Sequence, residues 1–295
     1  MRLSSLLPFA KRIVPIGAPS ATARRLVSDM RYELVPLKSV EAAMLQLPKG
    51  CSVSVTCSPA KGIPATIELS NRLQDLGHHV VPHIAARLVE DRDHTKRIAY
   101  WMRERGIDEM FLVGGDAPEP AGMYTEASTF LADLLDTDHG LKHIGVTAYP
   151  DGHALIDAAA LRTALHRKQD LLSQAGIEGH ATTQMCFDID QITSWLQAQR
   201  ADGITLPVHL GVPGVIDRTK LLTMGMRLGI GNSMRFVKKN SGTISRLFSP
   251  AGYDPAKLVG PISAKADSLG ITGLHSFTFN NVEATATWQR EYLAR

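Results

Sequence analysis

The chain has 295 residues, of which 44% are hydrophobic and 21% are charged, enough for one large domain or two average ones. Its 32 Lys and Arg exceed its 29 Asp and Glu by three. Residues 1–28 contain five basic side chains and no acidic one, so removing those five leaves 27 basic against 29 acidic side chains. Nucleic-acid binders carry a strongly basic surface, and we therefore expect no nucleic-acid partner.

The sequence also lacks the features of membrane, disulfide-rich and zinc-binding proteins. No apolar run approaches the ~18 residues that a membrane span needs. Three cysteines make no disulfide framework, and neither CxxC nor HExxH occurs. We predict a reduced, soluble, cytoplasmic protein with no membrane partner and no metal. Residues 1–28 have the composition of either a structural arm or a transit peptide.

Short β-rich runs alternate with longer segments of helical periodicity. The predicted strands are Tyr32–Leu37, Ser52–Cys57, His79–Ile84, Met110–Gly114, His143–Ala148, Ala181–Met185, Leu206–Gly211 and Gly273–Phe277. The predicted helices between them are Ala65–Leu76, His94–Arg105, Ala159–Leu172, Asp190–Gln199 and Arg218–Leu228. Several helices stop at a glycine, as at Gly77, Gly106 and Gly176. Strands rich in Val and Ile without strict alternation are typical of buried parallel strands.

Eight such strand–helix units in about 250 residues is the count for a closed (β/α)8 TIM barrel. We therefore predict an α/β protein with one barrel domain over residues 29–295 and an N-terminal extension over residues 1–28. Extra helices in Ser233–Leu269 interrupt the last repeat and are expected outside the barrel. A doubly wound sheet is the alternative, but it would normally carry a Gly-rich dinucleotide turn, and neither GxGxxG nor GxxxxGKS is present.

Polar residues follow most of the predicted strands, at the end where barrel enzymes place their chemistry. In chain order they are Glu33, Thr56, His83, Gly114-Gly115-Asp116, Tyr149 to His153, Gln184, and Thr278 with Asn280. Each has an ordinary structural alternative, such as a solvated strand residue for Glu33, a turn for Gly114-Gly115-Asp116, or core and capping roles for the histidines. Their order along one barrel is what points to a site.

Three of these residues suggest specific chemistry. Because Tyr32 and Leu34 share the opposite face of the strand, Glu33 can face inward, where burial disfavours its charged form and makes it a general acid near neutral pH. Two glycines allow a flat ligand to approach the backbone, with Asp116 accepting hydrogen bonds from ring N–H groups. The Gln184 carboxamide can both donate to and accept from a heterocycle.

Taken in order, the motifs resemble the methylenetetrahydrofolate reductase family. They are Tyr-Glu-Leu-Val-Pro around Glu33, Pro-His at His83, Gly-Gly-Asp at Asp116, Ala-Tyr-Pro-Asp-Gly-His from Ala148, Thr-Gln-Met-Cys-Phe-Asp around Gln184, Val-Pro-Gly-Val from Val212 and His-Ser-Phe-Thr-Phe-Asn from His275. The resemblance spans about residues 31–283. It implies a (β/α)8 barrel that reduces 5,10-methylenetetrahydrofolate to 5-methyltetrahydrofolate with a reduced nicotinamide, usually through bound FAD.

The resemblance also implies roles for individual residues. Glu33 matches the acid that helps to open the five-membered ring of the substrate. Residues that match or lie near substrate-binding positions are Asp116, Gln184, Phe277 and Asn281. Residues that match the positions lining the flavin in flavin-bound members are Thr56, His83, Gly114, Gly115, Tyr149 and His153.

The sequence departs from the family pattern on the flavin side. Thr56-Cys57-Ser58-Pro59 replaces a motif such as Thr-Tyr-Gly-Ala, Gly114 replaces an Arg that can reach the flavin, and Asn281 stands where an Arg commonly contacts folate. Arg167-Lys168 is the candidate for a basic pair that meets the pyrophosphate. We therefore expect NADH as co-substrate and direct hydride transfer without bound FAD, as in the flavin-independent actinobacterial type.

Other interpretations remain open from the sequence alone. They are an FAD-dependent reductase of the same reaction and a non-catalytic folate- or nucleotide-binding barrel. A Schiff-base aldolase would need a lysine at a strand end, and the candidates Lys38, Lys61 and Lys142 lie in or before loops. The choice between NADH and NADPH and the oligomeric state are not indicated.

Overall fold

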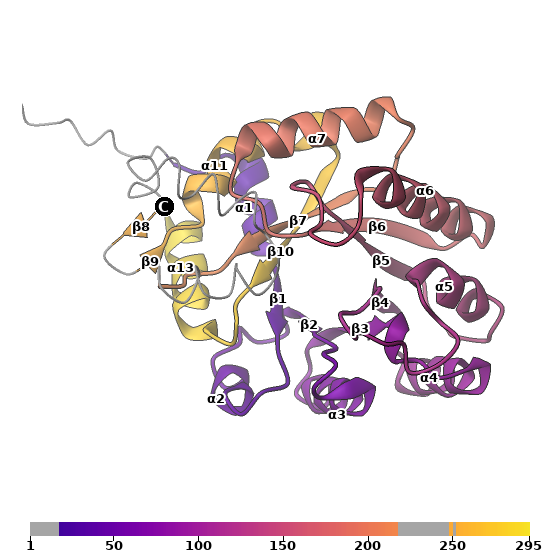
Figure 1. The fold of residues 1–295 in the computed structure, drawn as a ribbon. Helices are drawn as coiled ribbons and strands as arrows, with labels where there is room; N and C mark the ends of the chain where they lie inside the picture. The colour runs from indigo at the N-terminus through magenta and orange to yellow at the C-terminus, as the bar shows by residue number, and fades with distance from the viewer. Residues whose placement is uncertain (1–17, 218–247, 250–251) are drawn as a thin grey trace, which may run out of the picture.

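The computed structural model describes residues 18–217, 248–249 and 252–295. Eight parallel strands close into a barrel in the order β1, β10, β7, β6, β5, β4, β3, β2, which confirms the predicted (β/α)8 fold (Figure 1). The strands are β1 (Arg31–Leu34), β2 (Ser52–Val55), β3 (His79–Ala85), β4 (Glu109–Val113), β5 (His143–Ala148), β6 (Glu178–Thr183), β7 (Val208–Pro213) and β10 (Ile271–Phe277).

Helices follow most strands and cover the outside of the barrel. They are α2 (Val40–Met44), α3 (Gly62–Asp75), α4 (Arg92–Arg105), α5 (Ala127–Leu135), α6 (Ala158–Gln174), α7 (Ile189–Ala201) and α13 (Val282–Ala294), with a 3-10 turn at Ala86–Leu88. Asp91, Asp157 and Asp188 cap the first turns of α4, α6 and α7 by accepting backbone N–H groups. None of the helices in the described ranges is long and apolar enough to cross a membrane.

The predicted strands agree with the structure to within a few residues, and β5 has the predicted bounds. β1 ends at Leu34, three residues before the predicted end, because the side chain of Asn280 hydrogen-bonds both the N–H and the C=O of Val35. α1, α2, α5 and α13 are not among the predicted helices. The predicted helix Arg218–Leu228 and residues 233–247 of the predicted helical insert lie outside the described residues.

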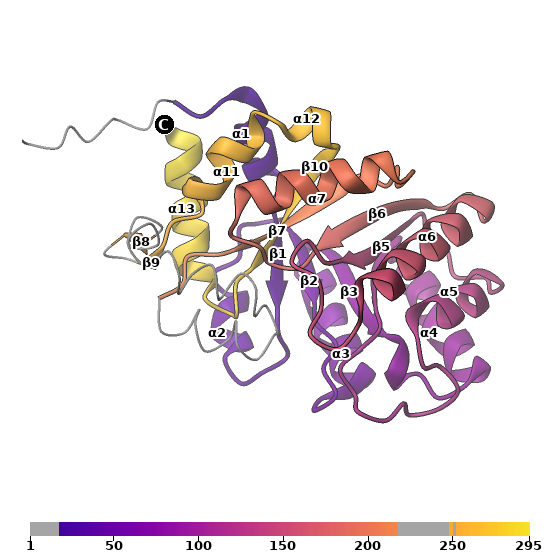
Figure 2. The ribbon, with the colours of Figure 1, turned by 45° about the horizontal axis from the view of Figure 1, so that its top comes forward.

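The elements around the last repeat pack at one side of the barrel. They include α1 (Ala21–Ser28), α11 (Ala256–Ser263), α12 (Ala266–Leu269) and the small hairpin of β8 (Phe248–Ser249) and β9 (Gly252–Tyr253). Figure 2 shows α1 beside α11 and α13. Leu26 and Val27 of α1 are fully buried, and Gln289 of α13 donates to the Val27 carbonyl at 2.6 Å. Residues 21–28, assigned to the extension from the sequence, thus share the hydrophobic core of the barrel.

The barrel interior is unusually polar for a fold whose centre is ordinarily filled by Val, Ile and Leu. Arg31 of β1 forms an ion pair with Glu109 of β4 at 2.7 Å, and His180 of β6 lies 3.7 Å from the same carboxylate. Neither pair joins neighbouring strands, so both cross the interior. The rings of His180 and His209 stack at 4.0 Å between centroids. Buried charges require partners, and here side chains of other strands supply them. We call Arg31, Glu109, His180 and His209 the lower layer of the barrel.

Glycines on neighbouring strands provide the space for these rings. A Cβ at Gly145 of β5 would lie 2.6 Å from Nε2 of His180, and one at Gly273 of β10 would lie 2.7 Å from Cδ2 of His209. Any larger residue at either position would displace a ring. The polar layer is therefore built into the strand sequences, and it forms the floor beneath the carboxyl ends of the strands.

Candidate active site

Glu33 lies inside the barrel at the carboxyl end of β1, with 6% of its surface exposed. Its Oε2 is 3.0 Å from Nε2 of His275, a residue of the adjacent strand β10 that is 1% exposed. Its backbone carbonyl accepts a hydrogen bond from the Thr278 hydroxyl. The side chain and the main chain of Glu33 are thus both held by the end of β10.

The turn after β10 fixes this strand end through an unusual backbone. Phe279 and Asn280 have positive φ angles of 49° and 61°, a left-handed conformation that costs of order 1–3 kcal/mol for residues other than glycine. The Asn280 amide offsets this cost by bonding both the N–H and the C=O of Val35 at 2.9 Å, and it also donates to Ser39 at 3.0 Å. Asn280, noted in the sequence as a strand-end residue, therefore locks the β1 terminus beside Glu33.

Burial sets the protonation states of the groups around Glu33. Desolvation raises the pKa of Glu33 to about 7, although the nearby charge that His83 would carry acts to lower it. Burial lowers the pKa of His83 to about 3 and that of His275 to about 3. At neutral pH both imidazoles are therefore uncharged, and Glu33 holds a proton for part of the time. A carboxyl group with this pKa suits general acid catalysis.

Glu33, His83 and His275 come from three strands and converge in the interior. Among the described residues they are the one group of His, Cys, Asp and Glu whose ligand atoms all lie within 4.8 Å of one another. Two imidazoles and a carboxylate are a donor set that a transition metal can use. Because His275 and Glu33 already lie at hydrogen-bond distance, we interpret the group as an acid with its imidazole neighbours.

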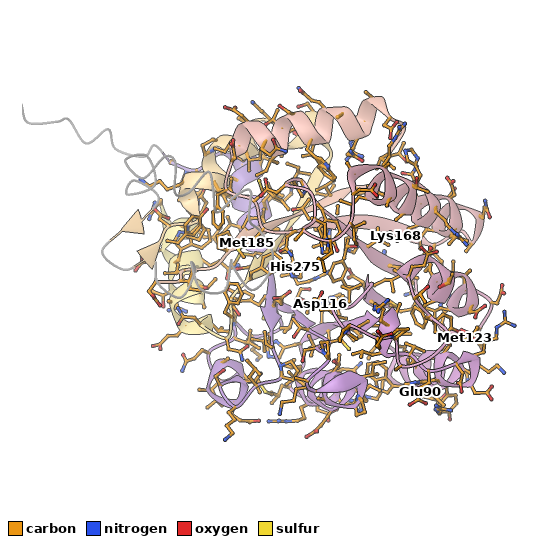
Figure 3. All side chains as sticks on the ribbon, in the orientation of Figure 1. Glu90, Asp116, Met123, Lys168, Met185 and His275 are labelled. Carbon is orange, nitrogen blue, oxygen red and sulfur yellow. The ribbon has the colours of Figure 1, made fainter. Side chains whose placement is uncertain are left out.

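A second part of the site follows β4. Asp116 is exposed in the loop after that strand, and Figure 3 shows it near His275 in projection. Gly115 has a φ of +96°, and a Cβ there would lie 3.0 Å from Cβ of Ala85, whereas a Cβ at Gly114 would meet nothing within 4 Å. The backbone before Asp116 is therefore bare on the side of Gly114, as a flat ligand requires.

Arg87 holds the loop that carries Asp116. Its guanidinium donates to the carbonyls of Ala117 at 2.8 Å, Pro118 at 2.7 Å and Thr125 at 3.1 Å. These bonds occupy Arg87 in shaping the loop after β4. Arg87, whose backbone N–H also donates to the Gly114 carbonyl at 3.0 Å, is thus a structural cation beside the Gly-Gly-Asp motif.

Tyr149 and His153 lie together in the loop after β5, with ring centroids 5.2 Å apart in an edge-to-face arrangement. Burial raises the pKa of Tyr149, and the negative charge of Asp116 raises it further. β4 and β5 are neighbouring parallel strands, so the loops that follow them lie at the same end of the barrel. These three predicted residues therefore form a second group, distinct from the Glu33 cluster.

The other predicted residues are placed as follows. The Thr56 hydroxyl is buried with no hydrogen-bond partner among the described residues. The Gln184 carboxamide oxygen accepts from the N–H of Met185 at 2.9 Å. The Phe277 ring lies 5.0 Å from the His275 ring. Asn281 begins α13 and donates to the Val215 carbonyl at 2.7 Å, so its amide nitrogen already has a structural partner.

Lys168 of α6 is a buried cation that points toward β5. Its ammonium donates to the carbonyl and the hydroxyl of Thr147, both at 3.4 Å, which is long for a charged donor. Burial lowers its pKa to about 8. Figure 3 shows Lys168 between α6 and the strands. It forms no ion pair within the part of the chain that the structure describes, and it can therefore accept an anionic group.

The family model described as methylenetetrahydrofolate reductase matches residues 37–227, more than half of the chain. The chain belongs to the methylenetetrahydrofolate reductase family. The matched segment of this family member includes β2 to β7 and Lys168. Glu33 and the residues of β10 lie outside the matched range, and their assignment rests on the geometry above and on the motif resemblance.

Among solved structures, the chain is similar to an apo-form chain from Toxoplasma gondii ME49 provisionally assigned as a deoxyribose-phosphate aldolase. It is 10% identical to this family member, with a TM-score of 0.43, and the match covers 92% of this chain and 96% of that chain. A likeness at this level carries no argument about activity.

If the chain binds a dinucleotide, the bare backbone at Gly114 could lie against its flat ring. Thr56, with its unpartnered hydroxyl, and Lys168, with its unpaired charge, can contact the polar parts of such a molecule. FAD, which family members usually bind, and NADH both present a flat ring and a pyrophosphate. The donor set therefore accommodates either.

Sequence reasoning missed several polar residues of the interior, and His275 is the most important because it contacts Glu33. The others are Arg31, Glu109, His180 and His209. Part of their signal was present, because in β1 polar residues stand on both sides of a buried aromatic one, as in Arg31-Tyr32-Glu33. That spacing indicates one face of a strand, but it does not reveal which residues meet across a barrel.

Proposed function

We propose that the chain reduces 5,10-methylenetetrahydrofolate to 5-methyltetrahydrofolate, with NADH as the hydride donor and without bound flavin. The observation that carries this proposal is Glu33: a carboxyl group with a pKa raised to about 7, buried at a strand end of a barrel from this reductase family. NADH supplies a hydride in this reaction, and the protein must supply a proton.

In the proposed reaction Glu33 donates its proton to the bridging N10 of the substrate. The bond between N10 and the methylene carbon then breaks, which leaves an iminium cation at N5. The hydride adds to the methylene carbon and completes the methyl group. The negative charge of Asp116, placed against the pterin, favours the transient cation. Each turnover consumes one proton, which Glu33 regains from solvent.

Direct transfer is supported by what stands at the flavin positions. Gly114 replaces an arginine, and Arg87 is occupied by three loop carbonyls. Losing a guanidinium removes a bidentate contact that no neighbouring residue reproduces. Direct transfer requires the donor and acceptor carbons within roughly 3–3.5 Å of each other, so the nicotinamide would lie where the flavin ring otherwise lies.

Lys168 is the residue we assign to the pyrophosphate of the dinucleotide. Lys168→Met keeps much of the side-chain volume but removes the charge, and we expect it to raise the KM for NADH about tenfold, the effect of losing ~1.4 kcal/mol of binding. Turnover at saturating NADH should change little. Arg167→Ala is the matched control, because Arg167 is exposed and lies 3.6 Å from Glu126. Equal KM values for the two variants would contradict the assignment.

The proposal is tested by NADH oxidation in purified protein whose visible spectrum has first been recorded. A colourless protein that oxidises NADH only when methylenetetrahydrofolate is added would support it. Oxidation that requires added FAD would indicate the flavin-dependent form of the same reaction. No oxidation with either addition would indicate a barrel that binds folate or nucleotide without chemistry.

A further inference from the structure

His275 is the only described side chain within hydrogen-bond distance of the Glu33 carboxyl group, at 3.0 Å. In the β1–β10 pair, Arg31 lies opposite His275 and Glu33 lies opposite Phe277. His275 therefore sits one inward position deeper in the barrel than Glu33. The imidazole contacts the acid from below and leaves the carboxyl ends of the strands open to a substrate.

The other titratable groups around Glu33 and His275 do not compete for the hydrogen bond between these two side chains. His83 of β3 has its ring 5.9 Å from the His275 ring, and its Nε2 has no hydrogen-bond partner among the described residues. Arg31 of β1 is committed to Glu109 of β4 and to the Ser52 hydroxyl of β2. The rings of Phe111 and Phe277 also neighbour the imidazole, with centroids 6.0 and 5.0 Å from that of His275. Within the cluster of Glu33, His83 and His275, Glu33 and His275 are thus the hydrogen-bonded pair.

We propose that His275 is a positioning residue for Glu33. Its ring is protonated on Nε2, and this N–H donates a hydrogen bond to Oε2 of Glu33. The acidic proton of Glu33 then stays on Oε1 and faces the substrate. This inference rests on the proposed function for its catalytic meaning. The hydrogen bond itself can be tested whether or not the chain is a reductase.

The tautomer decides whether Glu33 can act as an acid. A neutral imidazole has one donor and one acceptor nitrogen. With the proton on Nδ1, Glu33 would have to donate its own O–H to Nε2, and the proton would point into the barrel. With the proton on Nε2, the O–H remains available at the mouth.

The same arrangement assists the reaction as it proceeds. Before proton transfer, Nε2–H donates to a neutral carboxyl group. Afterwards it donates to a carboxylate, and a hydrogen bond to an ionised acceptor is shorter and about twice as strong. An interaction that strengthens during the step lowers its barrier. The Nδ1 atom, buried without a partner among the described residues, is left as an acceptor.

The first test is ¹⁵N NMR of histidine-labelled wild-type protein, in which the ring nitrogen shifts of His275 report the tautomer. We expect a protonated Nε2 and an unprotonated Nδ1 at pH 7, with the resonance assigned by its absence in His275→Gln. A protonated Nδ1 would overturn the proposal. This measurement requires no activity, and the His275→Gln variant serves only to assign the resonance.

The second test compares His275→Leu, which has no donor, with His275→Gln, whose amide can replace Nε2–H. We expect the Leu variant to raise the pKa of Glu33 by about one unit in ¹³C-carboxyl NMR, and to lower kcat about 10- to 100-fold with little change in the KM for folate. The Gln variant should restore most of the wild-type pKa of Glu33 and most of the wild-type kcat. His209→Leu removes a buried histidine that does not contact Glu33, and it should leave the titration of Glu33 unchanged.

Two results would contradict a positioning role. One is an unchanged pKa of Glu33 in His275→Leu, and the other is an equal loss of kcat in the Leu and Gln variants. If the wild-type protein reduces no folate, the proposed function fails, but the ¹⁵N and ¹³C experiments still decide whether His275 donates to Glu33.

Discussion

Glu33→Gln is expected to lower kcat by about 10²- to 10⁴-fold, the range for loss of a general acid. The KM for methylenetetrahydrofolate should change by less than about threefold, because an interaction made only in the transition state leaves ground-state binding intact. The Gln side chain has the shape of Glu and can still accept a hydrogen bond from Nε2 of His275. Steady-state kinetics and folate binding measured side by side give both numbers.

The control for this variant is Glu109→Gln, with its kcat calculated per folded molecule. Glu109 is also a buried carboxylate, but its partner is Arg31 in the lower layer of the barrel. Removing its charge leaves the buried Arg31 cation without a counter-charge and is expected to cost about 3–5 kcal/mol of stability. Its effect should appear in the free energy of unfolding and not in kcat. Near-normal turnover of Glu33→Gln would remove the general-acid assignment.

The pH profile of the wild-type enzyme follows from the same group. The acid must be protonated to act, and its pKa is raised to about 7 by burial. We therefore expect kcat/KM to be constant on the acid side of pH 7 and to fall about tenfold per unit above it. Activity that rises through this range would show that the ionised form of Glu33 is the active one.

Acidification from pH 6.5 to pH 5 is expected to remove most of the free energy of unfolding. Four buried histidines, His83, His180, His209 and His275, have pKa values lowered by desolvation, three of them to about 3. In the unfolded chain each takes up a proton near pH 6.5. Below that pH the unfolded state binds more protons than the folded state, so stability falls as the pH falls.

Glu33 acts in the opposite direction over part of this range. Its pKa is raised from 4.5 to about 7, so between these values the folded state holds a proton that the unfolded state lacks. The net difference is therefore about three protons, which corresponds to roughly 4 kcal/mol per pH unit near pH 5.5. A domain is usually stable by only about 5–15 kcal/mol, so this slope is large.

Urea denaturation at pH 7, 6 and 5 measures this slope. His209→Gln, which removes one buried imidazole outside the Glu33 cluster, should reduce it by about one proton. A free energy of unfolding that is independent of pH between 7 and 5 would contradict the neutral, buried state of these histidines.

The barrel could be predicted from the sequence because its main signals are local. Parallel strands buried on both faces are rich in Val and Ile, as in Val53 and Val55 of β2, and helices stop at glycines such as Gly106, whose φ is +63°. Counting these units gives the barrel, and the chemistry at the strand ends follows from the fold.

The floor of the site could not be predicted in the same way. Arg31 meets Glu109 and Glu33 meets His275 only because the barrel closes, and these pairs are separated by 78 and 242 positions along the chain. The start of β6 was mispredicted for a related reason. Its first residues, Glu178-Gly179-His180, carry no β-branched side chain, so the predicted strand began three residues late, at Ala181.

Asn281 shows a different limit. Its position in the motif predicts a substrate contact, and the structure adds a hydrogen bond from its amide nitrogen to the Val215 carbonyl at the start of α13. The sequence indicates where a residue stands relative to a strand end. The hydrogen bond that uses its side chain depends on a loop from another part of the chain.

Direct hydride transfer is tested by one turnover with NADH carrying deuterium at both C4 positions, in purified protein without added flavin. If the nicotinamide transfers its hydride directly to the iminium carbon, the 5-methyltetrahydrofolate formed will contain one deuterium in its methyl group, as measured by mass spectrometry. Product whose methyl group contains only hydrogen would show that the hydride passed through a carrier that exchanges with water, and it would contradict direct transfer.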